Sequence, residues 1–266
     1  MSHLVFQHSV SKGSKFNQIY IPSRYSLDFE VGDVVEVKLL QKKKMIFYSK
    51  NIKKLPDFKE KIIREIFSIL PKSERIEQVI VFGSFLTKDV DYNDLDILLL
   101  GKEEIEEQAY KELTEKLKLK FHVISARKDN LLKALEICPV TRGMLYYFVS
   151  NKAFSIPSKI TFDKNHIMHL LMMPEDLLRV KFSSGRVYYD ALRKLISIES
   201  FLEMSETTPD KIDGRLSKVL DERILQRLKD DLVVSDDIVR SIRKIIGKKI
   251  KKIKKTMRHP TLKGGV

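Results

Sequence analysis

The clearest pattern in the chain lies in residues 79–100, which read VIVFGSFLTKDVDYNDLDILLL. The apolar run at residues 79–82 is too short for a helix and rich in β-branched side chains, so it predicts a buried strand. A second apolar run at residues 95–100 predicts another strand. Between the two, Gly83 and Ser84 predict a turn into a short helix. Together with the helical patterns on either side, this order indicates an α/β domain.

The polar residues of this stretch are suited to a nucleotide and a metal ion. Backbone N–H groups at a helix start bind phosphate oxygens, Gly83 lets a ligand approach the backbone, and the Ser84 hydroxyl is a further donor. Asp94 and Asp96 stand two residues apart, so strand alternation points both carboxylates to one face. Because Mg²⁺ prefers one or two carboxylates plus substrate phosphates, we expect a site for Mg²⁺ (or Mn²⁺) and a phosphate group of a substrate.

The order strand, Gly83-Ser84, nine residues, Asp94-Leu95-Asp96, strand resembles the DNA polymerase β-like nucleotidyltransferases, and the minimal nucleotidyltransferases in particular. The resemblance covers about residues 57–160. It implies that Gly83 and Ser84 contact the triphosphate and that Asp94 and Asp96 hold Mg²⁺ during catalysis. The alternative interpretation is a tight turn with solvated acids, among them Asp89, Asp91 and Asn93.

Members of that superfamily usually carry a third acid on a later strand, and residues 119–125 (LKFHVIS), the equivalent segment here, offer none. Alternation places Lys120 and His122 on one face. His122 can act as a base near pH 7, or it can be a structural strand histidine. Asp129 and Glu115 are acids at other positions. Binding of metal and nucleotide is therefore better supported by the sequence than turnover.

The first fifty residues predict a small β module. Residues 17–22 and 31–40 alternate apolar and polar side chains, and residues 44–48 add a third short strand. A segment this small buries little by itself, so it needs another domain or a second copy.

The Ile21-Pro22 and Gly32-Asp33 pairs within this module resemble the swapped-hairpin DNA-binding domain of the AbrB/MazE class. That resemblance implies a homodimer that grips DNA. The alternative is an ordinary β-meander that covers the next domain.

The remaining pattern predicts helices. Residues 57–70, capped by Asp57, and the charged residues 102–118 flank the strand pair. From about residue 174 helices are expected at 175–182, 186–204, 216–232 and 236–257, with a loop at 205–214. We therefore expect a multidomain α+β protein: a β-rich module (1–50), a nucleotidyltransferase-like α/β domain with a mixed sheet (57–160), a helical domain (174–258) and a flexible tail (259–266).

The positive charge gathers at the C-terminal end. Eleven Lys and Arg residues and no acid follow Asp237, so residues 240–266 hold 11 of the formal +14 and residues 1–239 hold +3. Isoleucines at three- to four-residue steps form an apolar stripe. Three interpretations remain open: a core-docked helix with a solvated basic face, contacts to RNA or DNA phosphates, and, least favoured, an anionic membrane surface. The residues expected to contact nucleic acid are Lys248, Lys249, Lys251, Lys252, Lys254, Lys255 and Arg258.

Composition excludes some classes of protein. A single cysteine, Cys138, excludes an internal disulfide framework and fits a reducing compartment such as the cytoplasm. No apolar run approaches a membrane span of about 18–20 residues, and the start lacks a secretory signal. Many Lys, Glu and Ile residues with few Asn and Gln suggest a thermophile.

The leading hypothesis from the sequence is a Mg²⁺-dependent nucleotidyltransferase. It would transfer a nucleoside monophosphate from an NTP to a hydroxyl of an RNA, a protein or a small molecule, with Asp94, Asp96 and His122 in catalytic roles. One alternative is a non-catalytic dimeric DNA-binding regulator with a degenerate nucleotidyltransferase domain. Another is an antitoxin-type nucleotidyltransferase that modifies a partner toxin.

Overall fold

The computed structural model describes residues 8–25, 28–30, 32–38, 45–70, 75–87, 92, 94–101, 105–179, 184–205 and 208–258. The chain divides into two compact units, Met1–Lys43 and Lys44–Val266. Within the described ranges, none of the helices combines the length and the apolar character that crossing a bilayer requires. The fold is a multidomain α+β arrangement, as the sequence predicts, with a small N-terminal sheet, a mixed five-stranded sheet and C-terminal helices.

The N-terminal unit contains little regular structure. Strand β1 (Ser11–Lys12) pairs antiparallel with β2 (Asn17–Gln18), and one 3-10 turn, η1 (Ser23–Tyr25), follows. The strand predicted at residues 31–40 is wrong for residues 32–38, which are irregular. Residues 31, 39 and 40 lie outside the described part. The apolar side chains here are exposed: Val10, Phe16, Ile19, Tyr20, Ile21, Val34, Val35 and Val37.

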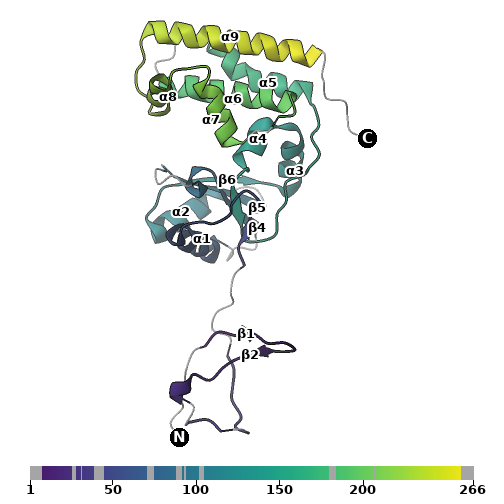
Figure 1. The fold of residues 1–266 in the computed structure, drawn as a ribbon, viewed down its shortest axis with the longest axis vertical. Coiled ribbons are helices and arrows are strands. Elements are labelled where there is room, and N and C mark those ends of the chain that lie inside the picture. Colours follow the sequence, from purple (N-terminus) through teal and green to yellow (C-terminus); the bar gives the residue numbers. More distant parts are fainter. Residues whose placement is uncertain are drawn as a thin grey trace. The chain divides into compact units, whose positions relative to one another are not determined.

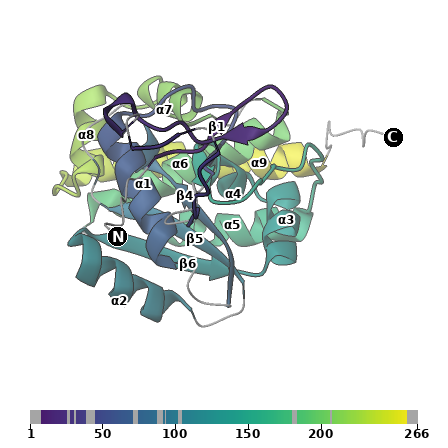
Figure 2. The same cartoon turned by 90° about the horizontal axis from the view of Figure 1, so that it is seen from below.

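The second unit is built on a sheet with the strand order β3-β7-β4-β5-β6, of which β4, β5 and β6 are labelled in Figure 2. Strand β4 is antiparallel to β5 and β7, β3 is antiparallel to β7, and β5 is parallel to β6, so the sheet is mixed as expected. The bounds are β3 Phe47–Tyr48, β4 Ile76–Phe82, β5 Leu95–Gly101, β6 Phe121–Ala126 and β7 Phe148–Ser150. The assignment of residues 44–48 to the N-terminal module is wrong, because β3 pairs with β7 in this sheet.

Helices cover both faces of the sheet, which explains why its central strands are almost wholly apolar (Figure 1). Alternate residues such as Val81 and Ile97 pack with α1 (Asp57–Ile69) and α2 (Glu106–Leu117). The residues between them, such as Ile80 and Leu98, pack with α3 (Lys128–Ile137) and the end of α4 (Pro139–Met144). Asp57 does not cap α1, since Pro56 holds the cap position without a side-chain bond.

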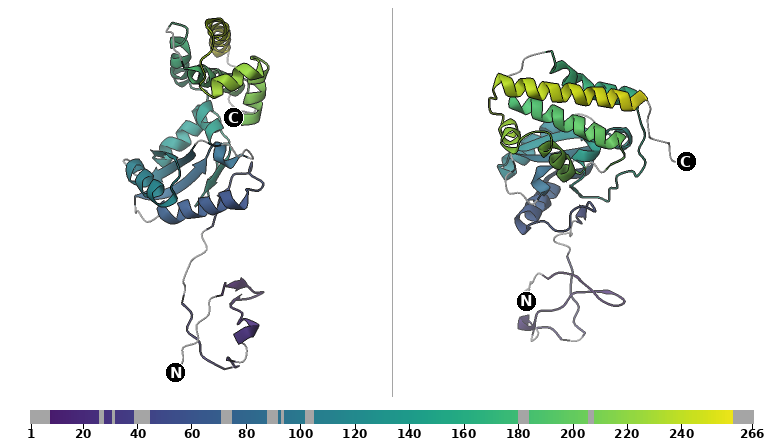
Figure 3. Two further views of the ribbon diagram at one scale, coloured as in Figure 1. Left: turned by 90° about the vertical axis from the view of Figure 1, so that its left-hand side faces the viewer. Right: turned by 45° about the horizontal axis from the view of Figure 1, so that its top comes forward.

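Five further helices share one apolar core (Figure 3). They are α5 (Lys164–Asp176), α6 (Gly185–Leu202), α7 (Pro209–Ser217), α8 (Glu222–Lys229) and α9 (Asp236–Arg258). The long helix α9 lies against α5 and α6. The buried apolar stripe of α9 consists of Ile242, Ile246, Ile250, Ile253 and Met257.

Three helical predictions need correction. The single helix predicted at 216–232 is wrong, because α7 ends at Ser217, α8 spans Glu222–Lys229, and the residues between them are not helical. Helices begin well before residue 174, since α5 starts at Lys164 and contains Pro174, and no helix spans 175–182 where that segment is described. The loop predicted at 205–214 is wrong beyond Thr208, whose side chain caps α7 by accepting a bond from the Lys211 N–H. A Thr-Pro-Asp sequence is a helix start as well as a loop signal, because proline suits the first helical position.

Candidate functional site

The predicted site residues meet at one edge of the sheet because of strand direction. Since β4 and β5 are antiparallel, the end of β4 lies beside the start of β5, and Phe82 pairs with Asp96. Since β5 and β6 are parallel, their starts meet, and Asp96 pairs with His122. Asp94 immediately precedes β5. The edge therefore brings Gly83, Asp94, Asp96 and His122 together on the face that α3 covers.

Gly83 is in contact with the carboxylate of Asp96. Its φ is +83°, a left-handed conformation that side chains rarely adopt. A Cβ atom at this position would lie 2.1 Å from Oδ2 of Asp96. Only glycine fits both this backbone conformation and the small space beside Asp96. The turn at Gly83 and the carboxylate of Asp96 are therefore packed directly against each other.

Ser84 begins the 3-10 turn η3 (Ser84–Leu86), which is shorter than a helix. The turn is closed by bonds from Leu86 N–H to the Gly83 carbonyl (3.2 Å) and from Thr87 N–H to the Ser84 carbonyl (3.0 Å). Phe85 and Leu86 are buried, whereas Ser84 is exposed. One turn carries little macrodipole, so phosphate binding here would rest on the hydroxyl and on local N–H groups.

Asp96 is partly buried. Its side chain is 22% exposed, and its Oδ1 lies 3.0 Å from Nδ1 of His122. Burial raises the pKa of Asp96, the hydrogen bond from His122 lowers it, and the charge of Asp94 raises it again, with a raised pKa as the result. A cation at this face would offset both the burial and the repulsion between the carboxylates.

His122 lies where strand alternation places it, on the same face as Asp96. Its side chain is 59% exposed. When Nδ1 carries the proton that is donated to Asp96, Nε2 is the nitrogen that can accept one. Lys120 lies two residues before His122, and its carbonyl accepts a hydrogen bond from the Leu95 N–H.

A third acid is not found among the residues that the structure describes. They contain no group of three or more His, Cys, Asp or Glu side chains placed for a metal ion. Glu115 belongs to α2, which covers the opposite face, and Asp129 lies in the first turn of α3. Asp89, Asp91 and Asn93 lie outside the described residues. Two carboxylates still fit Mg²⁺, which completes its shell with water and substrate phosphates.

The buried lysine Lys59 is a residue of this region that sequence reasoning missed. It lies in α1, is 1% exposed, and donates from Nζ to the Thr87 carbonyl at 2.9 Å. The rings of Phe85 and Tyr92 lie 5.4 and 5.8 Å from Nζ, within cation–π range. Lys59 therefore links α1 to Phe85, Thr87 and Tyr92. The sequence does contain a sign of this burial, because Lys59 shares the buried face of α1 with Ile63 and Ile66.

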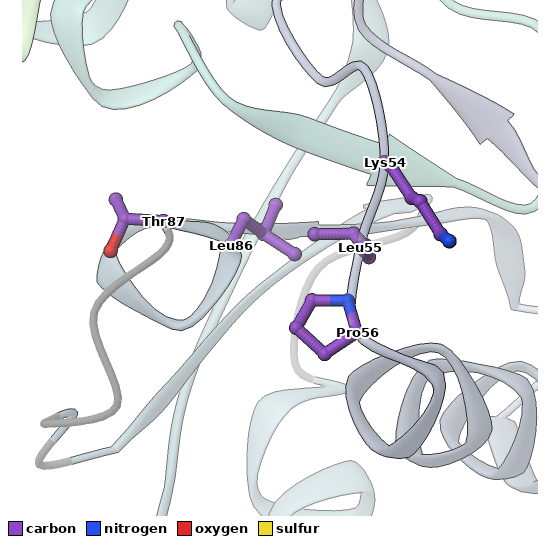
Figure 4. A pocket seen from close by; sticks show the side chains of 5 residues that line it. All are labelled: Lys54, Leu55, Pro56, Leu86 and Thr87. Carbon is purple, nitrogen blue, oxygen red and sulfur yellow. The ribbon is translucent and has the colours of Figure 1, made fainter.

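A hollow of about 310 Å³ lies beside η3 and the residues that precede α1 (Figure 4). Its lining residues are Lys54, Leu55, Pro56, Leu86 and Thr87. Leu55 and Leu86 belong to the core under α1 and α2. None of the predicted site residues lines the hollow, so it is not part of the candidate site.

The basic residues predicted on α9 divide into two groups. Lys249 pairs with Glu199, Lys252 pairs with Glu203, and Lys254 pairs with Glu175. The others are exposed: Lys248, Lys251, Lys255 and Arg258. Because the apolar stripe of α9 packs in the helical core, it is not available to a membrane surface.

Residues 64–140 match the family model described as Polymerase beta, Nucleotidyltransferase. The match spans β4, η3, β5 and β6, and so it includes Gly83, Ser84, Asp94, Asp96 and His122. It confirms the recognition of a DNA polymerase β-like nucleotidyltransferase domain in this chain. No curated protein matches the chain. The AbrB/MazE resemblance of the first fifty residues lies outside the match and stays a prediction.

Proposed function

We propose that this chain is a Mg²⁺- or Mn²⁺-dependent nucleotidyltransferase. It would transfer a nucleoside monophosphate from an NTP to an acceptor hydroxyl and release pyrophosphate. The observation that carries the proposal is the contact between Gly83 and the Asp96 carboxylate, beside Asp94 and His122. The exposed cations of α9 favour RNA over a protein or a small molecule as the acceptor.

Each site residue has a distinct part in this proposal. Ser84 and the backbone at Gly83 bind the triphosphate. Asp94 and Asp96 hold the metal ion, Asp96 through Oδ2 because Oδ1 bonds to His122. The metal, when bound, polarises the reacting phosphoryl group and stabilises the developing charge.

His122 takes the proton from the acceptor hydroxyl in this scheme. Nε2 accepts the proton as the hydroxyl oxygen bonds to the α-phosphorus and the bond to the pyrophosphate oxygen breaks. The Asp96 carboxylate then faces the imidazolium across the 3.0 Å bond to Nδ1 and stabilises its charge. His122 thus replaces the third carboxylate in accepting a proton.

The test is incubation with labelled NTPs and Mg²⁺, with and without RNA. We expect transfer of label to RNA that is lost in Asp94→Ala/Asp96→Ala. The matched control is Glu107→Ala/Glu115→Ala, which removes the same charge from exposed positions of α2 and should keep transfer. Transfer that survives the Asp94→Ala/Asp96→Ala change, or no transfer with any of the four NTPs, contradicts the proposal.

A dimeric DNA-binding regulator is the second candidate, and one observation favours it. Apolar side chains of the described N-terminal residues are exposed, including Val34 at 99%. Such surface is normally covered, and we propose that a second copy of this unit covers it.

Sedimentation of the full chain tests the dimer. A Val35→Ser/Val37→Ser variant should shift it toward the monomer, whereas Leu232→Ser/Val233→Ser, at exposed positions after α8, should not. A monomeric wild-type chain would refute the dimer. Salt-sensitive binding of duplex DNA that needs residues 1–50, in a chain without transfer activity, would favour the regulator over the enzyme.

A further inference from the structure

A basic hollow of about 330 Å³ lies between α6, α7 and α9, in the helical part of the chain. Helix α7, with its C-cap residue Lys218, and helix α9 contribute five cations to its lining, which also contains one acid and one valine. The lining residues are Glu199, Arg215, Lys218, Val219, Lys248, Lys249 and Lys252. Nothing in the nucleotidyltransferase proposal uses this hollow.

Two carboxylates of α6 hold part of this lining in place. Glu199 is 3% exposed and bonds to Nζ of Lys249 at 2.6 Å, with Arg215 at 3.6 Å. Glu203 pairs with Arg215 at 3.3 Å and with Lys252 at 2.8 Å. Lysine has three N–H donors and arginine five, so these acids leave donors unused. Cations that are already fixed lose less side-chain entropy when an anion binds.

The acids do not neutralise the basic hollow. Five lining cations face two carboxylates, Glu199 and the neighbouring Glu203, which leaves a net charge of +3. Lys218 and Lys248 form no ion pair with any residue that the structure describes. The hollow is therefore a prearranged site for an anion with several acceptor oxygens, the chemistry of a phosphate group.

A row of exposed cations continues from the hollow along α9. Its members recur at steps of three or four residues, the spacing of one helical face: Lys244, Lys248, Lys251, Lys255 and Arg258. In the described ranges these side chains make no ion pair. Lys248 belongs to both the hollow and the row. A continuous track of this kind suits a chain of phosphates better than a single free anion.

We propose that the basic hollow binds a backbone phosphate of a single-stranded nucleic acid whose further phosphates lie along the exposed row of α9. The inference rests on the proposed function in taking this strand as the acceptor, but the binding itself needs no chemistry. Phosphate contacts fix position without reading bases, so the affinity is independent of base sequence.

The experiment is fluorescence anisotropy with a labelled single-stranded RNA and the full chain carrying Asp94→Asn/Asp96→Asn, which prevents turnover. In this background Lys218→Gln removes a contact to the phosphate in the hollow and Lys248→Gln removes a contact to the first phosphate of the row. Each phosphate contact with a single strand contributes about 0.7 to the slope of log K against log salt. The slope should therefore fall by about 1.4, equivalent to about 25-fold weaker binding at about 0.1 M salt.

The matched control is Lys128→Gln/Lys133→Gln, which removes two exposed lysines from α3. It should leave the slope unchanged. Equal losses in the two double variants would show a general charge effect and overturn the proposal, as would unchanged binding in Lys218→Gln/Lys248→Gln. Thermal unfolding of each variant verifies that the helical core is intact.

Inorganic tripolyphosphate distinguishes a strand from a free anion. We expect it to compete with RNA only weakly, because it cannot occupy the row on α9. Tripolyphosphate could instead bind tightly, depend on Lys218 and Lys248, and leave RNA bound. That result would overturn the proposal that the hollow binds a phosphate of a nucleic acid strand. The wild-type chain could show no transfer while Lys218→Gln/Lys248→Gln still weakens RNA binding. That result would refute the proposed enzyme but support the binding of a strand at the hollow.

Discussion

The sheet edge and the basic hollow each contain a buried or partly buried carboxylate, but the charges around the two carboxylates differ. At the edge, the half-buried Asp96 faces a second carboxylate and a histidine, and its pKa is raised. In the hollow, the buried Glu199 is surrounded by Lys249, Arg215 and Lys252. An added cation would stabilise the carboxylates at the sheet edge, whereas the hollow has more positive than negative groups and would stabilise an added anion.

This difference suggests a division of labour between the two regions. The carboxylates at the edge would carry the chemistry, and the cations of α7 and α9 would carry affinity for the acceptor. The formal charge of +14 does not separate the two roles, because it is a sum over the chain in which residues after Asp237 hold 11 of the 14 charges.

The largest expected effect comes from Asp96→Asn. A metal ion stabilises the transition state by several kcal/mol, so its loss should reduce kcat by about 10³-fold. RNA affinity, measured by anisotropy, should stay within about twofold, because the phosphate contacts lie elsewhere. If Asp96→Asn also loses RNA affinity, the two regions do not have separate roles in chemistry and in binding.

Changes at His122 should have the next largest effect. His122→Gln removes a base that contributes about 10²-fold or more, and kcat should fall accordingly. His122→Asp places a third carboxylate beside Asp96, so the Mg²⁺ concentration for half-maximal transfer should decrease. Steady-state kinetics over a Mg²⁺ titration checks both. Wild-type kinetics in His122→Gln would make this residue structural.

Gly83→Ala should lower stability and displace Asp96. Its Cβ would meet Oδ2 of Asp96 at 2.1 Å in a left-handed backbone conformation, and strain of this kind destabilises by about 1–3 kcal/mol. Gly214→Ala is the matched control, because that glycine lies in α7 with nothing within 4 Å of the added Cβ. It should stabilise by up to about 1 kcal/mol. Chemical denaturation measures both, and equal stabilities would contradict the close contact.

The smallest effect concerns the pH dependence of the ion pairs at the hollow. The hydrogen bond from Lys252 and the nearby Arg215 lower the pKa of Glu203 below 4.5. Stabilisation by this carboxylate is therefore fully present above pH 4.5 and is lost as the pH falls through its folded-state pKa. Melting temperatures of wild type and Glu203→Gln should differ at pH 7 and converge as the pH falls through the folded-state pKa of Glu203. A constant difference would argue against the pairing.

The sequence predicted the strands β4, β5 and β6 of the central sheet, because their signals are local and periodic, but it did not predict β7. The apolar runs at 79–82 and 95–100 and the strand predicted at 119–125 correspond to β4, β5 and β6. Alternation predicted that Lys120 and His122 share a face, and the pairing of β6 with β5 puts His122 beside Asp96. The family match at residues 64–140 agrees with that assignment.

Features that depend on distant contacts were missed. Strand β3 has two residues, and only pairing with β7 identifies it as part of the central sheet. The basic hollow needs Arg215 of α7 beside Lys249 of α9, a contact across helices that periodicity does not report. Lys59 and Glu199 are charged residues on apolar helical stripes, a signal that was present but is ambiguous without the packing partners.

One set of kinetic measurements tests the separation of chemistry from affinity most directly. Transfer of labelled nucleotide is followed over a range of RNA concentrations for wild type and Lys218→Gln/Lys248→Gln, and RNA binding is measured for Asp94→Asn/Asp96→Asn. The account predicts that the lysine variant keeps kcat while its KM for RNA rises about 25-fold, and that the aspartate variant binds RNA normally but transfers nothing. A lysine variant that loses kcat at saturating RNA, or an aspartate variant that still transfers label, would contradict it.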